Sequence, residues 1–203
     1  MFKNMELGKE MYNWASDLFP INRSLTGPGV RETLTYLKNI VPELEIKAVK
    51  SGTKVFDWIV PDEWGLSEAY IEDDKGQRIL DFSECNLHLV GYSIAVDKML
   101  NLDELKKKLH TLPSQPDAIP YITSYYKRDW GFCMTYNQFK ELRDCNYHVV
   151  IKSKFIKGVL NFGEIYLPGD LKEEVLLSTY ICHPSMANNE LSGPVVAVQL
   201  AKW

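Results

Sequence analysis

Apolar side chains recur every three or four positions in two stretches near the start of the chain, which is the spacing of one face of an α-helix. The first stretch covers residues 5–19 and ends at Pro20, because proline cannot continue a helix. The second begins after Gly27-Pro28-Gly29 and runs to Val41. Residues 44–48 then alternate between apolar and polar side chains, as in a half-buried strand. The pattern therefore predicts helix, helix, strand.

From about residue 55 the pattern changes to short runs rich in aromatic and β-branched residues, which indicates strands divided by turns. We expect strands at residues 55–60, 69–71, 78–82, 87–93, 147–153, 159–167 and 175–181, with a hairpin turn at 73–76. Asn101 and Thr135 each stand three positions before Glu104 or Gln138, the spacing of a capping box, so each predicts a short helix. A last helix is expected from Ser192 onward, because proline in its first turn loses no hydrogen bond.

This order of elements predicts an α/β fold interrupted by a β-rich segment. We assign residues 1–55 and 155–203 to one α/β domain and residues 56–154 to a β-rich inserted domain.

Composition narrows the class of protein. The chain has 203 residues, 45% of them hydrophobic, which is enough to bury a core in one large or two small domains. Its 23 Lys and Arg residues against 27 Asp and Glu residues, with no basic run, argue against a nucleic-acid partner. Its apolar runs are far shorter than the roughly 20 residues of a membrane span. The first residues do not resemble a signal peptide, so we expect a cytoplasmic protein with no membrane partner.

The four cysteines are widely spaced and form no Cys-x-x-Cys pair. They are Cys85, Cys133, Cys145 and Cys182. This spacing argues against a zinc ribbon and, in a chain of this size, against a disulfide framework. We therefore expect reduced thiols. Cys182 precedes His183, but neighbouring residues of a regular strand point to opposite faces, which argues against a Cys/His catalytic pair.

The segment that carries chemistry lies between the strand expected at 175–181 and the last helix. His183 follows the strand, and Glu190 is the only carboxylate of the polar loop that comes next. Ligand sites of open α/β sheets lie at this edge, and a neutral imidazole nitrogen can bind a divalent metal. Taken alone, one histidine and one glutamate more simply have a structural role, in which His183 only hydrogen-bonds the loop while Asn188 and Asn189 form Asx turns.

This segment resembles the metal-binding strand and loop of the zinc aminopeptidase superfamily, which reads His-x-Asp and then Asp-Asn-x-Ser-Gly at the start of a helix. His183 matches the zinc-ligand histidine, and residues 189–193 match the second motif in spacing. Two positions differ: Asn189 replaces the aspartate that bridges two zinc ions, and Ser185 replaces the carboxylate that orients the histidine. The resemblance implies a zinc ligand at His183, with Asn189 or Glu190 as a second ligand.

The resemblance extends along the chain. Residues 22–27 and 163–169 are also similar to that superfamily. Residues 58–64, 86–88, 119–126 and 130–133 resemble the bacterial aminopeptidase-like proteins that are often found beside polysaccharide-biosynthesis genes. It implies a zinc-aminopeptidase-like (phosphorylase/hydrolase-like) sheet with helices. It also implies a metallopeptidase-like hydrolase of amide bonds in small peptides or amide-linked sugar precursors. The superfamily's general-base Glu and further ligands follow this helix, so they are expected beyond Trp203, with this chain as the amino-terminal half.

Two interpretations from other classes of protein remain open. The sequence does not indicate the oligomeric state. Ser185 and Asn189 are compatible with a catalytically degenerate fold that only binds a peptide or carbohydrate. Alternatively, the aromatic run at 121–132 forms a stacking platform for sugars or peptides, or simply packs the core. The candidate substrate-binding residues of that run are Tyr125, Tyr126 and Trp130.

Other chemistry-bearing residues have simpler structural interpretations. Asp57, Asp62 and Glu63 could form a carboxylate cluster for acid/base catalysis, but they flank Pro61 and more simply cap a turn. His88 lies in an expected strand and is interpreted as a structural histidine.

Overall fold

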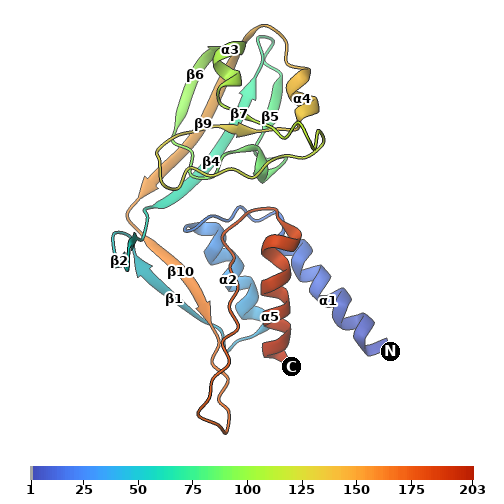
Figure 1. Cartoon of the computed structure of the whole chain (residues 1–203), viewed down its shortest axis with the longest axis vertical. Coiled ribbons are helices and arrows are strands. Elements are labelled where there is room, and N and C mark those ends of the chain that lie inside the picture. Colours follow the sequence, from blue (N-terminus) through green and yellow to red (C-terminus); the bar gives the residue numbers. More distant parts are fainter. Residues whose placement is uncertain (1) are drawn as a thin grey trace. The chain divides into compact units, whose positions relative to one another are not determined.

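A computed structural model describes residues 2–203 of the chain, with side chains from Glu6 onward. The chain divides into two compact units: residues up to Glu63 together with Ile156–Trp203 form the first, and Trp64–Phe155 form the second. Helices and several small sheets are both present, so the expected mixed α/β class is confirmed (Figure 1). That residues 56–154 are a domain inserted into an aminopeptidase fold stays a prediction.

Three helices build the core of the first unit: α1 (Phe2–Leu18), α2 (Pro28–Ile40) and α5 (Ser192–Lys202). They lie side by side in Figure 1. The buried residues of this core, from the helices and the segments next to them, are Trp14, Leu18, Val30, Leu34, Leu37, Val41, Leu44, Leu191, Val195 and Val198. The face of α2 predicted from its apolar spacing is therefore the face that is buried, and burial of such side chains supplies most of the helices' stability.

The turn before α2 lies tightly against that helix. A Cβ atom at Gly29 would collide with the backbone carbonyl oxygen of Asn22. The sequence therefore needs glycine here for close backbone approach, and the approach fixes the position of Arg23, the next residue along the turn.

Two antiparallel pairs of strands complete the first unit. β1 (Glu45–Lys50) pairs with β10 (Val159–Glu164). β2 (Lys54–Val55) pairs with β3 (Trp58–Ile59), so the single strand expected at 55–60 is wrong. Phe56 has a φ of 53°, a left-handed conformation that turns the chain between the two short strands.

The second unit is built on a four-stranded sheet with the order β5-β4-β9-β6. Its strands are β4 (Glu63–Glu72), β5 (Arg78–Asp81), β6 (Val96–Asn101) and β9 (Asn146–Ile156). The expected hairpin turn joins β4 to β5, and Asp73 stabilises it by accepting hydrogen bonds from the backbone N–H groups of Lys75 and Gln77. A shorter parallel pair joins β7 (Leu109–His110) to β8 (Phe132–Cys133).

Both expected capping boxes are confirmed. In α3 (Leu102–Lys106) the Asn101 side chain accepts from Glu104 N–H while the Glu104 carboxylate accepts from Asn101 N–H. Thr135 and Gln138 make the same reciprocal pair at α4 (Tyr136–Lys140). Each box pairs two backbone donors that the first turn of a helix leaves without a partner.

The strand expected at 87–93 is wrong. Residues Asn86–His88 form a short 3₁₀ helix, η1, and Tyr92 has a φ of 66°, which breaks any extended run. Only isolated bridges remain there, at Leu89 and Gly91.

The strand expected at 175–181 is also wrong. Residues 165–186 hold no helix or strand, and in Figure 1 this segment leaves β10, turns and returns to the start of α5. Val175 is 89% exposed and Leu176 88% exposed. A strand needs a neighbour to pair its backbone groups, and no described strand pairs with this segment. The described residues accordingly form several small sheets rather than one aminopeptidase-like sheet.

None of the helices in the described part of the chain combines the length and the hydrophobicity that crossing a bilayer requires.

Candidate functional site

His183 lies on the segment that leads into α5, and a π-helical turn connects the two. This turn, η2 (Ala187–Leu191), was not predicted from the sequence, whereas the start of α5 at Ser192 was. Leu191 anchors the turn in the core of the three helices. A π turn closes on the fifth residue rather than the fourth, and such turns recur at functional sites.

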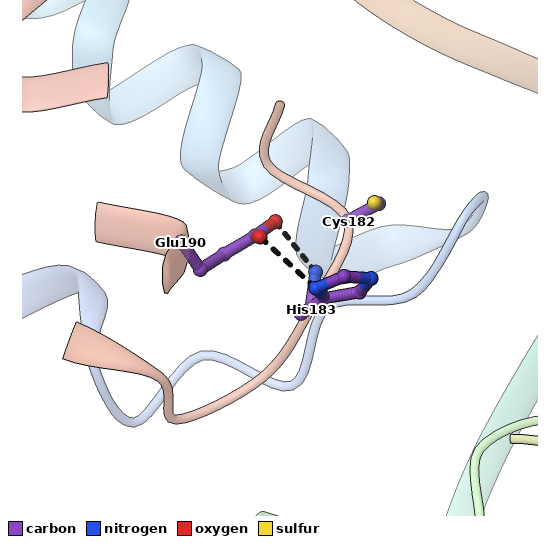
Figure 2. A group of neighbouring side chains, drawn as sticks. All are labelled: Cys182, His183 and Glu190. Atoms are coloured by element: carbon purple, nitrogen blue, oxygen red, sulfur yellow. Dashed lines mark hydrogen bonds and ion pairs between the residues drawn. The ribbon is translucent and has the colours of Figure 1, made fainter. Parts of the chain in front are cut away.

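The turn brings together the three residues that were predicted as metal ligands. Glu190 is fully buried, and its Oε1 accepts a hydrogen bond of 2.6 Å from the backbone N–H of His183. Its Oε2 lies 3.2 Å from Nδ1 of the same histidine, and Figure 2 shows the carboxylate facing the imidazole. Asn189 Oδ1 lies 3.3 Å from that Nδ1. His183, Asn189 and Glu190 therefore form one cluster.

A fourth member, Arg23, was missed by sequence reasoning. Its side chain is buried, with 1% of the residue exposed. Nη1 donates to the carbonyl oxygen of Leu18 at 2.5 Å, and Nε donates to the carbonyl oxygen of His183 at 3.1 Å. The only signal in the sequence was the resemblance of residues 22–27 to the superfamily, which gives Arg23 no role by itself.

Charge and burial oppose each other in this cluster. Burial raises the pKa of Glu190, while the hydrogen bond from His183 N–H and the nearby charges of His183 and Arg23 act in the opposite direction. Burial likewise lowers the pKa of Arg23, which the negative charge of Glu190 opposes. Among the described side chains, Arg23 Nη2 and Glu190 Oε2 are buried atoms without a hydrogen-bond partner. The two opposite charges therefore support each other in a site that water does not solvate.

Cys182 lies beside His183 and Glu190 and is a further possible donor to a metal. Its Sγ, a nitrogen of His183 and an oxygen of Glu190 all lie within 4.8 Å of one another. These donor types suit zinc. Without a metal, burial raises the pKa of Cys182 to about 11, so a metal bound there would have to displace the thiol proton. The Arg23 guanidinium also opposes a second cation beside Glu190.

The outer side of the cluster suits a metal better. Figure 2 shows that the second ring nitrogen of His183 points away from Glu190. Asn189 is exposed, and its amide oxygen lies 3.3 Å from Nδ1, the ring nitrogen that faces Glu190. Imidazole and oxygen donors are a fitting partial set for a divalent metal ion.

The aromatic residues predicted to bind substrate have different environments. Tyr125 packs edge-on against Tyr92 and its hydroxyl lies 2.9 Å from that of Tyr121. Tyr126 is 90% exposed, and Trp130 lies under the ammonium group of Lys108. Phe132 from the same run is fully buried.

The carboxylates near Pro61 have structural partners. Glu63 makes two hydrogen bonds with the Arg31 guanidinium, at 2.9 and 3.0 Å, and accepts a third from Val159 N–H. Asp62 pairs with Lys157 at 2.6 Å. His88 is buried, with Nδ1 2.8 Å from the carbonyl oxygen of Cys133. These contacts agree with the structural interpretation of each residue.

The chain is similar along nearly its whole length to proteins of Clostridium acetobutylicum. A protein of Clostridium acetobutylicum named "Putative polysaccharide biosynthesis protein with aminopeptidase-like domain" is 53% identical over 197 residues, which cover 97% of this chain and 45% of that protein. A crystal structure of a "putative peptidase" from Clostridium acetobutylicum matches with a TM-score of 0.94 at 53% identity, over 97% of this chain and 46% of that one. The chain thus spans a little under half the length of both relatives.

An aminopeptidase from Aneurinibacillus sp. strain AM-1 aligns over 96% of this chain and 58% of its own, but at 12% identity and a TM-score of 0.39. That likeness is too low to support an argument.

The close relatives confirm the resemblance of this chain to aminopeptidase-like proteins associated with polysaccharide biosynthesis. The chain belongs to the family described as "Domain of unknown function (DUF4910)", whose model matches residues 12–203.

Proposed function

We propose that this chain supplies part of the metal centre of a zinc-dependent, aminopeptidase-like hydrolase. The observation that carries the proposal is the meeting of His183, Asn189 and Glu190 at η2, in the segment that matches the superfamily's metal-binding motif. The names of the relatives, one with an aminopeptidase-like domain and one a peptidase, support the same class of reaction.

His183 is the first proposed ligand, because its imidazole is partly exposed and held in place by the loop. Asn189 is the second, provided that its amide turns from Nδ1 toward a metal on Nε2, and Glu190 remains the alternative. Bound zinc would lower the pKa of a water molecule and polarise the carbonyl of an amide bond. The proposed substrate is a small peptide or an amide-linked sugar precursor. Tyr125, Tyr126 and Trp130 of the second unit remain candidate contacts for a sugar or peptide, independently of hydrolysis. The relatives are more than twice as long, and we assign the general base and the remaining ligands to their other part.

Zinc binding to the chain tests this proposal, measured by competition with a chromophoric chelator. We expect His183→Ala to weaken zinc binding at least tenfold, because an imidazole ligand is lost. Asn189→Asp should strengthen binding about tenfold, because it replaces a neutral amide ligand with a carboxylate. Asn188→Asp makes the same change of charge one position earlier, on another exposed residue, and should change zinc binding little.

Equal zinc binding by the wild-type chain and the His183→Ala variant would overturn the ligand assignment. Equal gains from Asn189→Asp and Asn188→Asp would reduce the role of Asn189 to a general effect of charge.

A catalytically degenerate binding module is the second candidate, and Ser185 favours it. Its hydroxyl donates to the carbonyl oxygen of Phe19 at 3.2 Å, so at this position the motif's carboxylate is replaced by a loop contact. The longer form of the protein distinguishes the two functions. Zinc binding without hydrolysis of any aminoacyl amide would favour the binding module.

A further inference from the structure

Both backbone groups of His183 are held by buried charged side chains. Glu190 accepts from its N–H at 2.6 Å, and the Arg23 guanidinium donates to its carbonyl oxygen at 3.1 Å. Hydrogen bonds with charged partners are shorter and stronger than neutral ones, especially away from water. The backbone of His183 is therefore fixed from two sides, by residues far apart in the sequence.

The imidazole of His183 is constrained as well. Nδ1 lies 3.2 Å from Glu190 Oε2 and 3.3 Å from Asn189 Oδ1. An ionised carboxylate can only accept a hydrogen bond, and so can the amide oxygen. These neighbours favour a proton on Nδ1, which leaves the lone pair of a neutral imidazole on Nε2. A proton on Nδ1 gives Glu190 Oε2, which has no other hydrogen-bond partner among the described residues, an N–H donor at 3.2 Å.

We propose that Arg23 and Glu190 are positioning residues that hold the backbone of His183 and fix its ring as the Nδ1–H tautomer, with Nε2 directed to the ligand. Glu190 thereby takes the orienting part that the superfamily's motif gives to the carboxylate at the position of Ser185. Its fully buried carboxylate acts through His183 instead of binding the metal itself. The inference rests on the proposed metal-binding role of His183 for its function, but its geometry can be tested without metal.

Arg23 completes the arrangement because it supplies the positive charge that a buried carboxylate needs. Removing either member of a buried charged pair leaves the other without compensation. The position of Arg23 depends in turn on the close contact between Gly29 and Asn22. The turn at residues 22–27 lies outside the metal-binding motif at residues 183–193. Through Arg23 it nevertheless becomes part of the site.

The tautomer of His183 tests the proposal directly. Long-range ¹H–¹⁵N spectra of the metal-free, ¹⁵N-labelled chain at about pH 8, where an ordinary histidine is neutral, show which ring nitrogen carries the proton. We expect Nδ1–H for His183, whose signals are assigned by their loss in His183→Ala. His88 is an internal reference in each spectrum, because its Nδ1 faces the carbonyl oxygen of Cys133 and must donate.

Substitution of Glu190 should change this signature. In Glu190→Gln the amide can also donate to Nδ1, so we expect the Nε2–H form to become populated. Glu63→Gln is the matched control: it removes another buried carboxylate, whose contacts are with Arg31 and Val159, and should leave His183 unchanged. Arg23→Lys keeps the charge but loses the planar guanidinium, which donates to the carbonyl oxygens of both Leu18 and His183. We therefore expect the His183 signals to broaden or shift.

A third variant keeps the proposal falsifiable if the Glu190→Gln chain does not fold. Asn189→Ala removes the other oxygen near Nδ1, and we expect Nδ1–H to persist because Glu190 alone suffices. A wild-type Nε2–H form, or a switch to it in Asn189→Ala, would overturn the proposal. So would an unchanged spectrum in a folded Glu190→Gln chain.

Zinc binding separates this inference from the proposed function. If both hold, Glu190→Gln weakens zinc binding about 10- to 100-fold, as is typical when the partner of a ligating histidine is removed. If His183→Ala leaves zinc binding unchanged while the tautomer behaves as expected, the metal-centre proposal fails and the positioning role stands.

Discussion

Two buried glutamates of the first unit have opposite electrostatic surroundings. Glu63 receives hydrogen bonds from the Arg31 guanidinium and from Val159 N–H, and these hold its pKa below the ordinary value. Glu190 has lost more solvation than its partners return, so its pKa is raised. Glu63 therefore stabilises the fold. The buried carboxylate of Glu190 carries a desolvation cost instead, which its proposed role in positioning His183 explains.

The lowered pKa of Glu63 makes its contribution to stability depend on pH. Unfolded, this carboxyl titrates near its ordinary value of 4.5, and folded it titrates lower. The stabilisation is therefore complete above the unfolded pKa and is lost as pH falls through the folded one. We expect Glu63→Gln to lower the free energy of unfolding by about 1–2 kcal/mol near pH 7, a modest value because Arg31 is 41% exposed.

Urea unfolding followed by circular dichroism measures this difference. The gap between the wild-type chain and Glu63→Gln should shrink as the pH falls from about 7 to well below 4.5, the ordinary pKa of the unfolded carboxyl. A gap that is equally wide at both pH values would show that the loss comes from packing instead of charge.

At the scale of elements, we expect the substitution of glycine by alanine to have opposite effects on stability at two helical positions. Gly29→Ala places a methyl group against the Asn22 carbonyl oxygen in the first turn of α2, so we expect a loss of about 1–3 kcal/mol. Gly8 is exposed on α1 with open space around it, and Gly8→Ala should stabilise the chain by up to about 1 kcal/mol. Thermal or urea unfolding gives both values.

The two variants also distinguish a general change in stability from a change in the geometry around His183. If the turn at residues 22–27 positions Arg23, the His183 signals shift in Gly29→Ala and stay in place in Gly8→Ala. Equal effects on His183 would contradict that link.

Local signals in the sequence were good predictors of elements. The apolar spacing of Val30, Leu34 and Leu37 located the buried face of α2, and the capping boxes located α3 and α4, because these patterns act within a few residues. The run at 175–181 has a strand's composition, but a strand also depends on a distant partner, which composition cannot show.

The candidate site was predicted only in part, for the same reason. His183, Asn189 and Glu190 lie close in sequence and were found by motif. Arg23 stands 160 positions before His183, and only folding brings it there. The inward direction of Glu190 depends on η2, and nothing in the local pattern distinguishes a π turn from an ordinary start of α5.

At the scale of the whole molecule, the segment 165–186 differs from the rest of the described chain. It is long, holds no helix or strand and exposes several large apolar side chains: Tyr166, Leu167, Leu171, Val175, Leu176 and Leu177. Backbone of this kind is accessible to proteases. We expect trypsin to cut after Lys172 well before it cuts after Lys98, which is also exposed but paired within β6. Mass spectrometry of a digestion time course orders the two cuts, and earlier cleavage at Lys98 would contradict the expectation.

The three-helix core of the first unit contains residues from both sides of the expected cut after Lys172. Trp14, Leu18 and the apolar face of α2 precede Lys172, while Leu191, Val195 and Val198 follow it. A nicked chain should therefore stay together as two non-covalent pieces, with the short carboxy-terminal fragment carrying His183 and Glu190 and the long one carrying Arg23. Mixing the two separated pieces should therefore restore the cluster around His183, which neither piece can form alone.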